Sequence, residues 1–192
     1  MCPLLENAEE NKVHAGFYTI GYQGAEIGSF VATLVAAGVS LVVDVRDVAH
    51  SRKPGFSKRS LERHLAEAGL GYVHIRALGD PKPGREAARS GDYRRFRQIF
   101  TSHLRTDEAK AALRETGDLL KNDTACLLCF EHDHSVCHRA MVAEKLAGAT
   151  GARVHHLRAP RTTAAGRTGM KVDDCGHWHD GSRRPREGVT PC

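Results

Sequence analysis

The chain has 192 residues, of which 41% are hydrophobic and 27% are charged, and its formal net charge is +5. This is a normal composition for one soluble domain with a short appendage. No apolar run approaches the roughly 18 residues of a membrane span, and the first 16 residues lack a secretory pattern. We therefore expect a cytoplasmic protein without membrane contact. Its six cysteines are expected to stay reduced, because their spacing does not suit a disulfide scaffold.

Strand-like and helix-like segments alternate along the chain. A first strand is expected at 17–22, followed by a helix over 26–38, and a continuous apolar run predicts a buried strand at 40–45. The later segments are a helix over 57–69, a strand at 72–75, one or two helices over 92–120, a strand at 124–130, a helix over 136–147 and a strand at 153–157. This order predicts an α/β fold of three layers, with a mostly parallel sheet of about five strands and helices on both faces.

The alternating pattern covers only the middle of the chain. We expect an N-terminal extension over 1–16, an α/β domain over 17–158 and a basic, disordered tail over 159–192. Three tail residues have side chains that can ligate a metal, and these are Cys175, His177 and His179. A short tract in such a tail is more often without function, so the sequence assigns them no role.

Polar and reactive residues stand where the predicted strands end. Tyr22 follows the first strand, Asp44 and Arg46 close the second, and Cys129 and Glu131 close the fourth. In open parallel sheets, ligands bind beyond the carboxyl ends of the strands. The sequence therefore predicts a functional site at that edge of the sheet.

The stretch 126–139, CLLCFEHDHSVCHR, holds half of the cysteines. Its CxxC spacing suggests a redox pair, but both cysteines lie in an apolar run, and residues three apart on a strand point to opposite faces. We therefore expect Cys126 to be a core residue. We expect Cys137 in the first turn of a helix capped by Ser135, where the helix dipole and Arg139 lower the pKa of a thiol.

The loop over 44–61 is basic and suggests an anion site at the same edge. Arg46 offers a guanidinium with bidentate reach, and Arg139 offers a second one near a helix N-terminus. Ser51 lies in the loop, and Phe56 is expected to pack against the following helix or to cover the site. A solvated basic loop is the alternative interpretation, and the net charge suits a phosphate-bearing ligand without requiring one.

A metal ion is a competing ligand for the cysteine-rich stretch. Cys129, Cys137 and His138, with Glu131 or His132, could surround a zinc ion. However, the spacing is irregular and lacks a paired CxxC or HxxxH pattern. The leading hypothesis therefore assigns no metal ligand and names no cofactor.

Four segments, YTIGYQG, DVRDVAHSRKPGFS, YVHIRALGDP and CLLCFEHDHSVCHRAMVAEKL, occur in the order of a known family. From residue 17 to residue 147 the chain resembles domain of unknown function 488, a family of uncharacterised bacterial proteins. The resemblance implies an α/β fold and no established reaction. It places the family's motif positions at Gly21, Asp44, Arg46, Ser51, Phe56, Cys129, Glu131, Cys137, His138 and Arg139. After Glu131 the family often has a Pro-containing turn, where this chain has His132-Asp133-His134.

These features predict an enzyme or ligand-binding domain that takes a phosphate-bearing ligand, either a nucleotide or a nucleic acid. Cys137 or Cys129 would be the nucleophile or redox thiol, and Glu131 a general acid or base. The residues assigned to chemistry are Cys129, Glu131, Cys137 and His138, and those assigned to the ligand are Tyr22, Asp44, Arg46, Ser51 and Arg139. Two alternatives stay open, namely a zinc or iron domain using Cys129, Cys137 and His138, and a nucleic-acid-binding module. The reaction, the substrate and the oligomeric state do not follow from the sequence.

Overall fold

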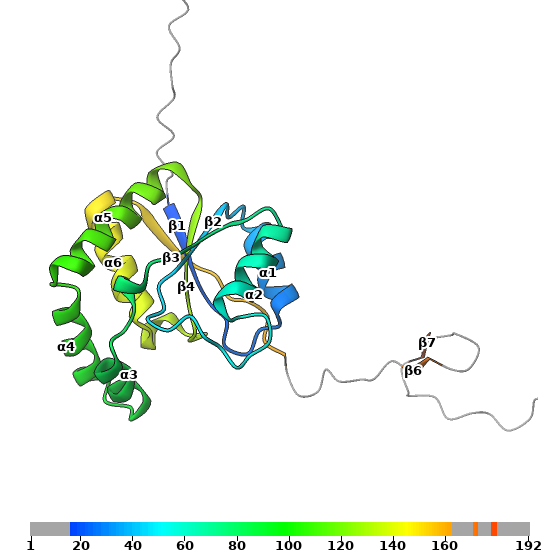
Figure 1. Ribbon diagram of the computed structural model, residues 1–192, viewed down its shortest axis with the longest axis horizontal. Helices are drawn as coiled ribbons and strands as arrows, with labels where there is room; N and C mark the ends of the chain where they lie inside the picture. The colour runs from blue at the N-terminus through cyan, green and yellow to red at the C-terminus, as the bar shows by residue number, and fades with distance from the viewer. Residues whose placement is uncertain (1–15, 163–170, 173–177, 180–192) are drawn as a thin grey trace, which may run out of the picture. The chain divides into compact units, whose positions relative to one another are not determined.

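The computed structural model describes residues 16–162, 171–172 and 178–179. The chain divides into two compact units, Met1–Arg161 and Thr162–Cys192. The first unit is built around a five-stranded sheet (Figure 1). Within its described part, the second unit has the antiparallel strands β6 (Lys171–Val172) and β7 (Trp178–His179). The predicted extension falls outside the described residues up to position 15, as do Cys175 and His177 of the predicted tail.

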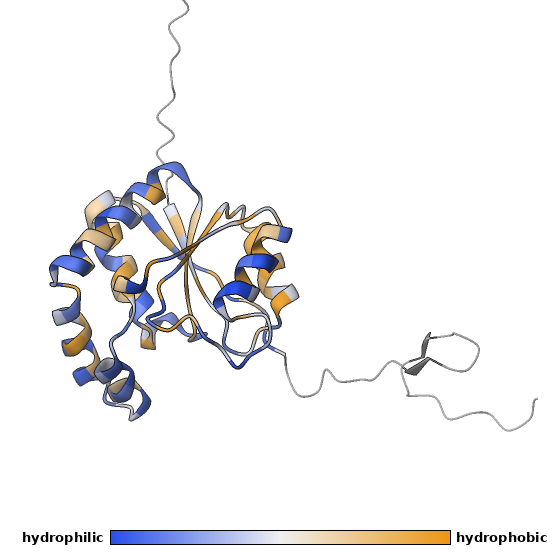
Figure 2. Cartoon of the chain, viewed as in Figure 1, coloured by the Kyte–Doolittle hydropathy of each residue, from blue (hydrophilic) through white to orange (hydrophobic). Residues whose placement is uncertain are grey.

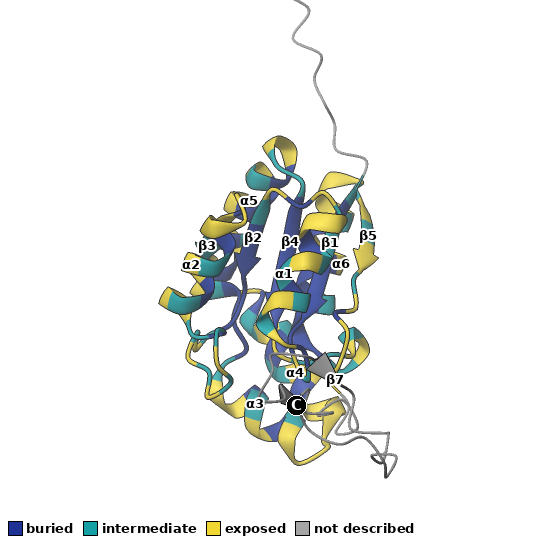
Figure 3. Cartoon of the chain, turned by 90° about the vertical axis from the view of Figure 1, so that its right-hand side faces the viewer, coloured by how far each residue is buried: buried dark blue, intermediate teal, exposed yellow. Residues whose placement is uncertain are grey.

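All strands of the first unit run parallel, in the order β3-β2-β4-β1-β5. The strands are β1 (Gly16–Gly21), β2 (Leu41–Asp44), β3 (Gly71–His74), β4 (Ala125–Cys129) and β5 (Arg153–His156). Every strand predicted from the sequence is present, and no strand end differs from its predicted position by more than one residue. The three inner strands are buried while β5 at the edge is largely exposed (Figure 3). The predicted three-layer α/β fold is therefore confirmed.

Helices cover both faces of the sheet (Figure 1). The helices α1 (Ile27–Ala36) and α2 (Lys58–Glu67) pack on one face. The other face is covered by α3 (Lys82–Arg89), α4 (Tyr93–His103), α5 (Asp107–Asn122) and α6 (His138–Thr150). The short 3-10 helices are η1 (Arg76–Leu78) and η2 (His134–Val136). In the part of the chain that is described, no helix is long and apolar enough to cross a membrane.

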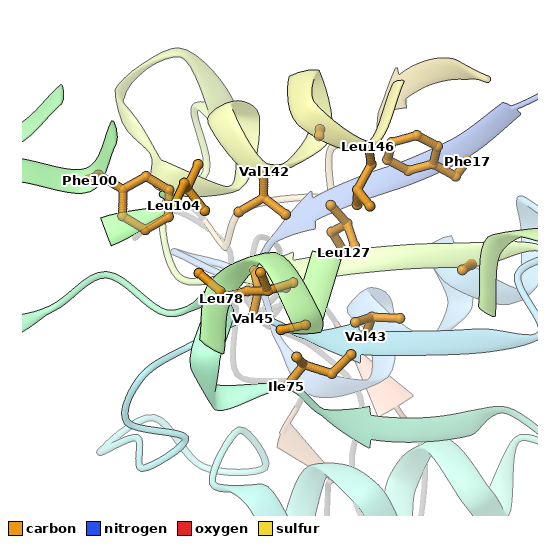
Figure 4. Close-up of a cluster of buried hydrophobic side chains, with 14 of the residues drawn as sticks. Phe17, Val43, Val45, Ile75, Leu78, Phe100, Leu104, Leu127, Val142 and Leu146 are labelled. Atoms are coloured by element: carbon orange, nitrogen blue, oxygen red, sulfur yellow. The ribbon is translucent and has the colours of Figure 1, made fainter. Parts of the chain in front are cut away.

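The helices turn their apolar sides toward the sheet and their polar sides outward (Figure 2). This arrangement produces two hydrophobic cores, one on each side of the sheet. Figure 4 shows the core under α4 and α6, where Leu127 of β4 lies below Val142 and Leu146, and Phe100 lies beside Leu104. Cys126 is fully buried in the opposite core, as expected for a core cysteine. The two cysteines of the CxxC spacing therefore lie on different faces of β4.

The helix start near Cys137 differs from the prediction. Asp133 accepts a hydrogen bond from the backbone N–H of Ser135, and this cap begins η2 rather than α6. Because η2 occupies the positions predicted for the first turn, α6 starts only at His138. Cys137 is the N-cap residue of α6 and not a member of its first turn, and Ser135 lies inside η2. The sequence also predicted no helix at 82–89, where α3 is found.

Candidate functional site

The carboxyl end of β4 lies between β1 and β2, which brings three loops together. Gly21 pairs with Cys129 in register, and the N–H of Val45 donates to the carbonyl of Leu128 at 3.1 Å. The segment after β4 then continues along the end of β1, where the N–H of Gln23 donates to the carbonyl of Phe130 at 2.8 Å. The predicted edge of the sheet is thus where the candidate residues converge.

Gly21 is required by the close approach of the segment after β4. A Cβ atom at this position would lie 1.7 Å from the carbonyl oxygen of Glu131, which is a backbone atom that cannot swing away. The same Cβ would lie 2.9 Å from Nη1 of Arg139. The absence of a side chain at Gly21 therefore lets Glu131 sit directly over the strand ends.

Four reactive side chains meet at this point, namely Cys129, Glu131, Cys137 and His138, and we call them the Cys/Glu/His cluster. One candidate ligand atom from each lies within 4.8 Å of all the others. Oε2 of Glu131 is 3.2 Å from the sulfur of Cys129 and 2.9 Å from that of Cys137. All four residues were assigned to chemistry from the sequence, and the fold brings all four together.

His138 is oriented by the backbone of the loop after β2. Its Nε2 lies 2.8 Å from the carbonyl oxygen of Val45, which only accepts hydrogen bonds, so Nε2 carries a proton. The other ring nitrogen, Nδ1, lies 3.6 Å from the sulfur of Cys129. Nδ1 therefore points into the Cys/Glu/His cluster, where it carries a proton when the ring is charged and a lone pair when the ring is neutral.

Burial and mutual interactions shift the pKa values of the residues in the Cys/Glu/His cluster. Burial raises the pKa of Glu131 to about 7, and the facing Cys137 adds to this effect. Burial also raises the pKa of Cys129 well above its usual value. For Cys137, burial acts in the same direction, but the neighbouring Cys129 and His138 outweigh it and hold the pKa well below its usual value. Burial lowers the pKa of His138, yet the interaction with Cys137 outweighs it and raises the pKa to about 9.

Asp44 and Arg46 form a buried ion pair behind the site. Oδ1 of Asp44 accepts from Nε of Arg46 at 2.8 Å, and Oδ2 accepts from Nη2 at 2.5 Å and from the Tyr72 hydroxyl at 2.7 Å. Nη1 of Arg46 donates to the Tyr22 hydroxyl at 3.1 Å and to the Phe56 carbonyl at 2.9 Å. Asp44 orients Arg46, but most N–H groups of the guanidinium are already hydrogen-bonded inside the protein.

Arg139 is also buried and occupied. Its Nη1 donates to the carbonyl of Glu131, and its Nη2 donates to the carbonyl of His132 at 3.1 Å. The side chain is 1% exposed. Arg139 therefore fastens the segment after β4, and it is not open to an anion in the way that the sequence suggested.

A cavity of about 660 Å³ opens beside the Cys/Glu/His cluster. The predicted site residues that line it are Tyr22, Arg46, Ser51, Cys129, Glu131 and His138. Asp44, Arg139 and Cys137 do not line it, and Cys137 instead borders a smaller hollow beside α4. The other residues that line the cavity had no site role predicted from the sequence, and they are Asp47, Val48, His50, Arg52, Asp80, Lys82, Arg85, Glu86, Ala88, Arg89, Tyr93, Phe130 and Val136.

Asp80 was not predicted as a site residue, but like the predicted ones it is a buried ionisable residue that lines the cavity. Its side chain is buried at 5% exposure, and its Oδ1 has no hydrogen-bond partner. Burial raises the pKa of Asp80 to about 6. The sequence held a usable signal, because Asp80 follows the third strand in the segment ALGDP, and all parallel strands end at the same edge.

Comparison with known proteins identifies a family for this chain. The family described as "Domain of unknown function DUF488" matches residues 26–146, a span that contains the whole Cys/Glu/His cluster. No curated protein and no solved structure matches the chain. The family match covers more than half of the sequence and contains three of the four motifs quoted above, while the first, YTIGYQG, lies just before it. The chain therefore belongs to the DUF488 family, a domain of unknown function.

Proposed function

We propose that this domain binds one transition-metal ion, zinc or iron, through the Cys/Glu/His cluster and presents it to a phosphate-bearing ligand in the adjoining cavity. The observation that carries the proposal is the convergence of four donor atoms within 4.8 Å. Tetrahedral bonds of about 2.0–2.3 Å put donor atoms about 3.3–3.8 Å apart. The separations of Cys129 Sγ from His138 Nδ1, 3.6 Å, and from Glu131 Oε2, 3.2 Å, are close to that range, and the 2.9 Å between Glu131 Oε2 and Cys137 Sγ is shorter.

The hydrogen bond that orients His138 also supports a metal ion. The hydrogen bond of His138 to a backbone carbonyl is the partner that metal-bound histidines usually have, since it fixes the tautomer and the ring orientation. Two thiolates and one carboxylate would carry three negative charges in a buried place. A divalent cation would neutralise two of them, and the nearby positive charge of Arg139 also favours the thiolate forms of Cys129 and Cys137.

The donor types narrow the choice of ion. Thiolate and imidazole ligands suit zinc and iron, whereas magnesium and calcium prefer oxygen. Glu131 is the least buried of the four residues and lines the cavity. Its carboxylate is therefore the donor that can leave the ion and act on a ligand as a general acid or base, the role assigned to it from sequence.

Metal content tests the proposal directly. The full chain, purified and reconstituted separately with Zn²⁺ and Fe²⁺, should retain about one equivalent after desalting. Cys129→Ala and Cys137→Ala should each retain roughly a tenth or less, because a thiolate ligand is lost. The matched control is Cys126→Ala, which removes a cysteine from the same strand but from the opposite core. Circular dichroism should show that all three variants are folded.

Two results would overturn the metal proposal. One is a folded wild-type chain that retains neither ion after reconstitution. The other is retention of a full equivalent by both Cys129→Ala and Cys137→Ala, since the ion would then lie elsewhere.

A thiol-dependent activity is the second candidate, favoured by the pair of Cys137 and His138. The lowered pKa of Cys137 and the raised pKa of His138 describe a thiolate beside an imidazolium, which is the arrangement of an activated nucleophile. In the metal-free protein at neutral pH, iodoacetamide should then label Cys137 much faster than Cys126. Equal, slow labelling of the two would rule this candidate out.

A further inference from the structure

Exposed hydrophobic side chains are concentrated around the cavity. Of the four large hydrophobic residues that are exposed in the described part of the chain, three line this cavity, and these are Val48, Tyr93 and Phe130. They are 54%, 43% and 44% exposed. Single exposed hydrophobic residues are ordinary, but a group that shares one concave site indicates an apolar ligand group.

The two aromatic rings come from different elements, and one of them, Phe130, is held in place by other rings. Tyr93 opens α4, and Phe130 directly follows β4. The ring of Phe130 packs edge-on against Tyr22, with centroids 5.3 Å apart, and Tyr22 in turn stacks on Phe56 at 4.4 Å. Because this stack orders Phe130 before a ligand arrives, little side-chain freedom is lost when a flat ring binds against it.

Two arginines of the cavity have no partner among the residues that the structure describes. Arg52 lies in the loop after β2, and Arg89 is the last residue of α3. Both line the cavity and both are exposed. Within residues 16–162, neither has an ion pair or a side-chain hydrogen bond, in contrast to Arg85, which is paired with Asp47. Unpaired guanidiniums beside a cavity favour a phosphate, which they can bind in a bidentate way.

We infer that the ligand of this cavity is a nucleotide. Tyr93 and Phe130 contact the base, and Val48 completes the apolar wall. Arg52 and Arg89 bind the phosphate, so the anion role moves away from Arg46 and Arg139. A volume of about 660 Å³ is in the usual range for a small-molecule site. The inference rests on the proposed function, because it assigns the ligand of the same site.

A calorimetric titration measures how much the base and the phosphate each contribute to binding. The metal-loaded full chain would be titrated with the four nucleoside 5′-monophosphates, with the matching nucleosides and with ribose 5-phosphate, in about 50 mM salt. At least one monophosphate should bind about tenfold or more tightly than both its nucleoside and ribose 5-phosphate, because only the nucleotide uses the rings and the arginines together.

Variants test the assignment of each residue. Arg89→Gln should weaken the monophosphate about tenfold and leave the nucleoside unchanged, because it removes one charged phosphate contact. Phe130→Ala should weaken the monophosphate and the nucleoside to the same degree. The controls are Arg94→Gln, which removes an exposed arginine of α4 outside the cavity, and Val35→Ala, which removes the exposed hydrophobic residue that lies elsewhere. Neither control should change binding.

Three outcomes would overturn the nucleotide assignment. They are no binding of any monophosphate at about 1 mM, equal binding of ribose 5-phosphate, and equal weakening by Arg94→Gln and Arg89→Gln. Preference for the end of a single-stranded oligonucleotide over every monophosphate would assign the site to nucleic acid instead. Metal content measured on the same samples keeps the two proposals apart. A chain with its metal and no nucleotide binding refutes only the ligand, and nucleotide binding without metal refutes only the ion.

Discussion

Replacement of Asp44 by asparagine should destabilise the protein strongly. Asp44 is fully buried, and its carboxylate is the counter-ion of the buried Arg46 guanidinium. An asparagine keeps the oxygen that accepts from Nε of Arg46, but it replaces Oδ2 by an N–H₂ group. The hydrogen bonds from Nη2 of Arg46 and from the Tyr72 hydroxyl are then lost.

The magnitude follows from these two bonds. Each hydrogen bond to a charged group contributes about 1.5–3 kcal/mol, so the loss is about 3–6 kcal/mol. Breaking a buried ion pair from one side independently suggests about 3–5 kcal/mol. Since small domains are stable by about 5–15 kcal/mol, Asp44→Asn removes a large part of the free energy of unfolding.

Urea unfolding at pH 7, followed by far-UV circular dichroism, measures this loss. A second variant, Asp44→Asn combined with Arg46→Met, should be more stable than Asp44→Asn alone, because no uncompensated guanidinium remains. The control is Glu67→Gln, which breaks the exposed pair with Arg63 and should cost less than about 1 kcal/mol. A loss below about 1 kcal/mol for Asp44→Asn, or a double variant no more stable than the single one, would refute the reasoning.

Two further predictions concern the strand ends. Gly21→Ala should destabilise the folded protein by about 1–3 kcal/mol or more and should lower metal retention, because its Cβ would clash with the Glu131 carbonyl. As a control, Gly28→Ala lies in an open position of α1 and should stabilise the folded protein by about 0.5–1 kcal/mol. Equal urea midpoints for the two variants would contradict this. Asp80 should make stability fall as pH rises from about 4 to about 6, because the folded carboxyl, with its pKa raised to about 6 from the usual 3.8, keeps a proton that the unfolded chain releases. Subtracting the curve of Asp80→Asn isolates this slope, and a difference that rises with pH would contradict the assignment.

The layers of the fold could be predicted because they depend on local patterns. The apolar run at 40–45 and the alternation of strands with helices carry the information for a buried parallel sheet. The helix α3 was missed because Pro83 and Gly84 stand in its first turns, and both residues have low helix propensity. The start of α6 was misplaced because the cap at Asp133 begins a 3-10 turn before it.

The candidate site could be predicted in its residue types and only partly in its roles. Strand ends pointed to Cys129 and Glu131, and the sequence pattern pointed to Cys137 and His138. Two arginines show which information a sequence pattern does not contain. Arg46 and Arg139 look like ligand-binding residues in a sequence, but whether a guanidinium is free depends on which carbonyls and carboxylates the fold places around it.

Hydrophobic periodicity and strand ends are local properties, and for this reason the sequence predicts the succession of strands along the chain, every long helix except α3, and the edge at which reactive side chains gather. Three facts depend on the assembled fold. Four donor atoms lie within 4.8 Å, Asp80 and two aromatic rings line the cavity beside them, and Arg52 and Arg89 are the arginines of that cavity without a partner among the described residues. These facts depend on contacts between residues as far apart as Val45 and His138. Such contacts exist only once the sheet is assembled.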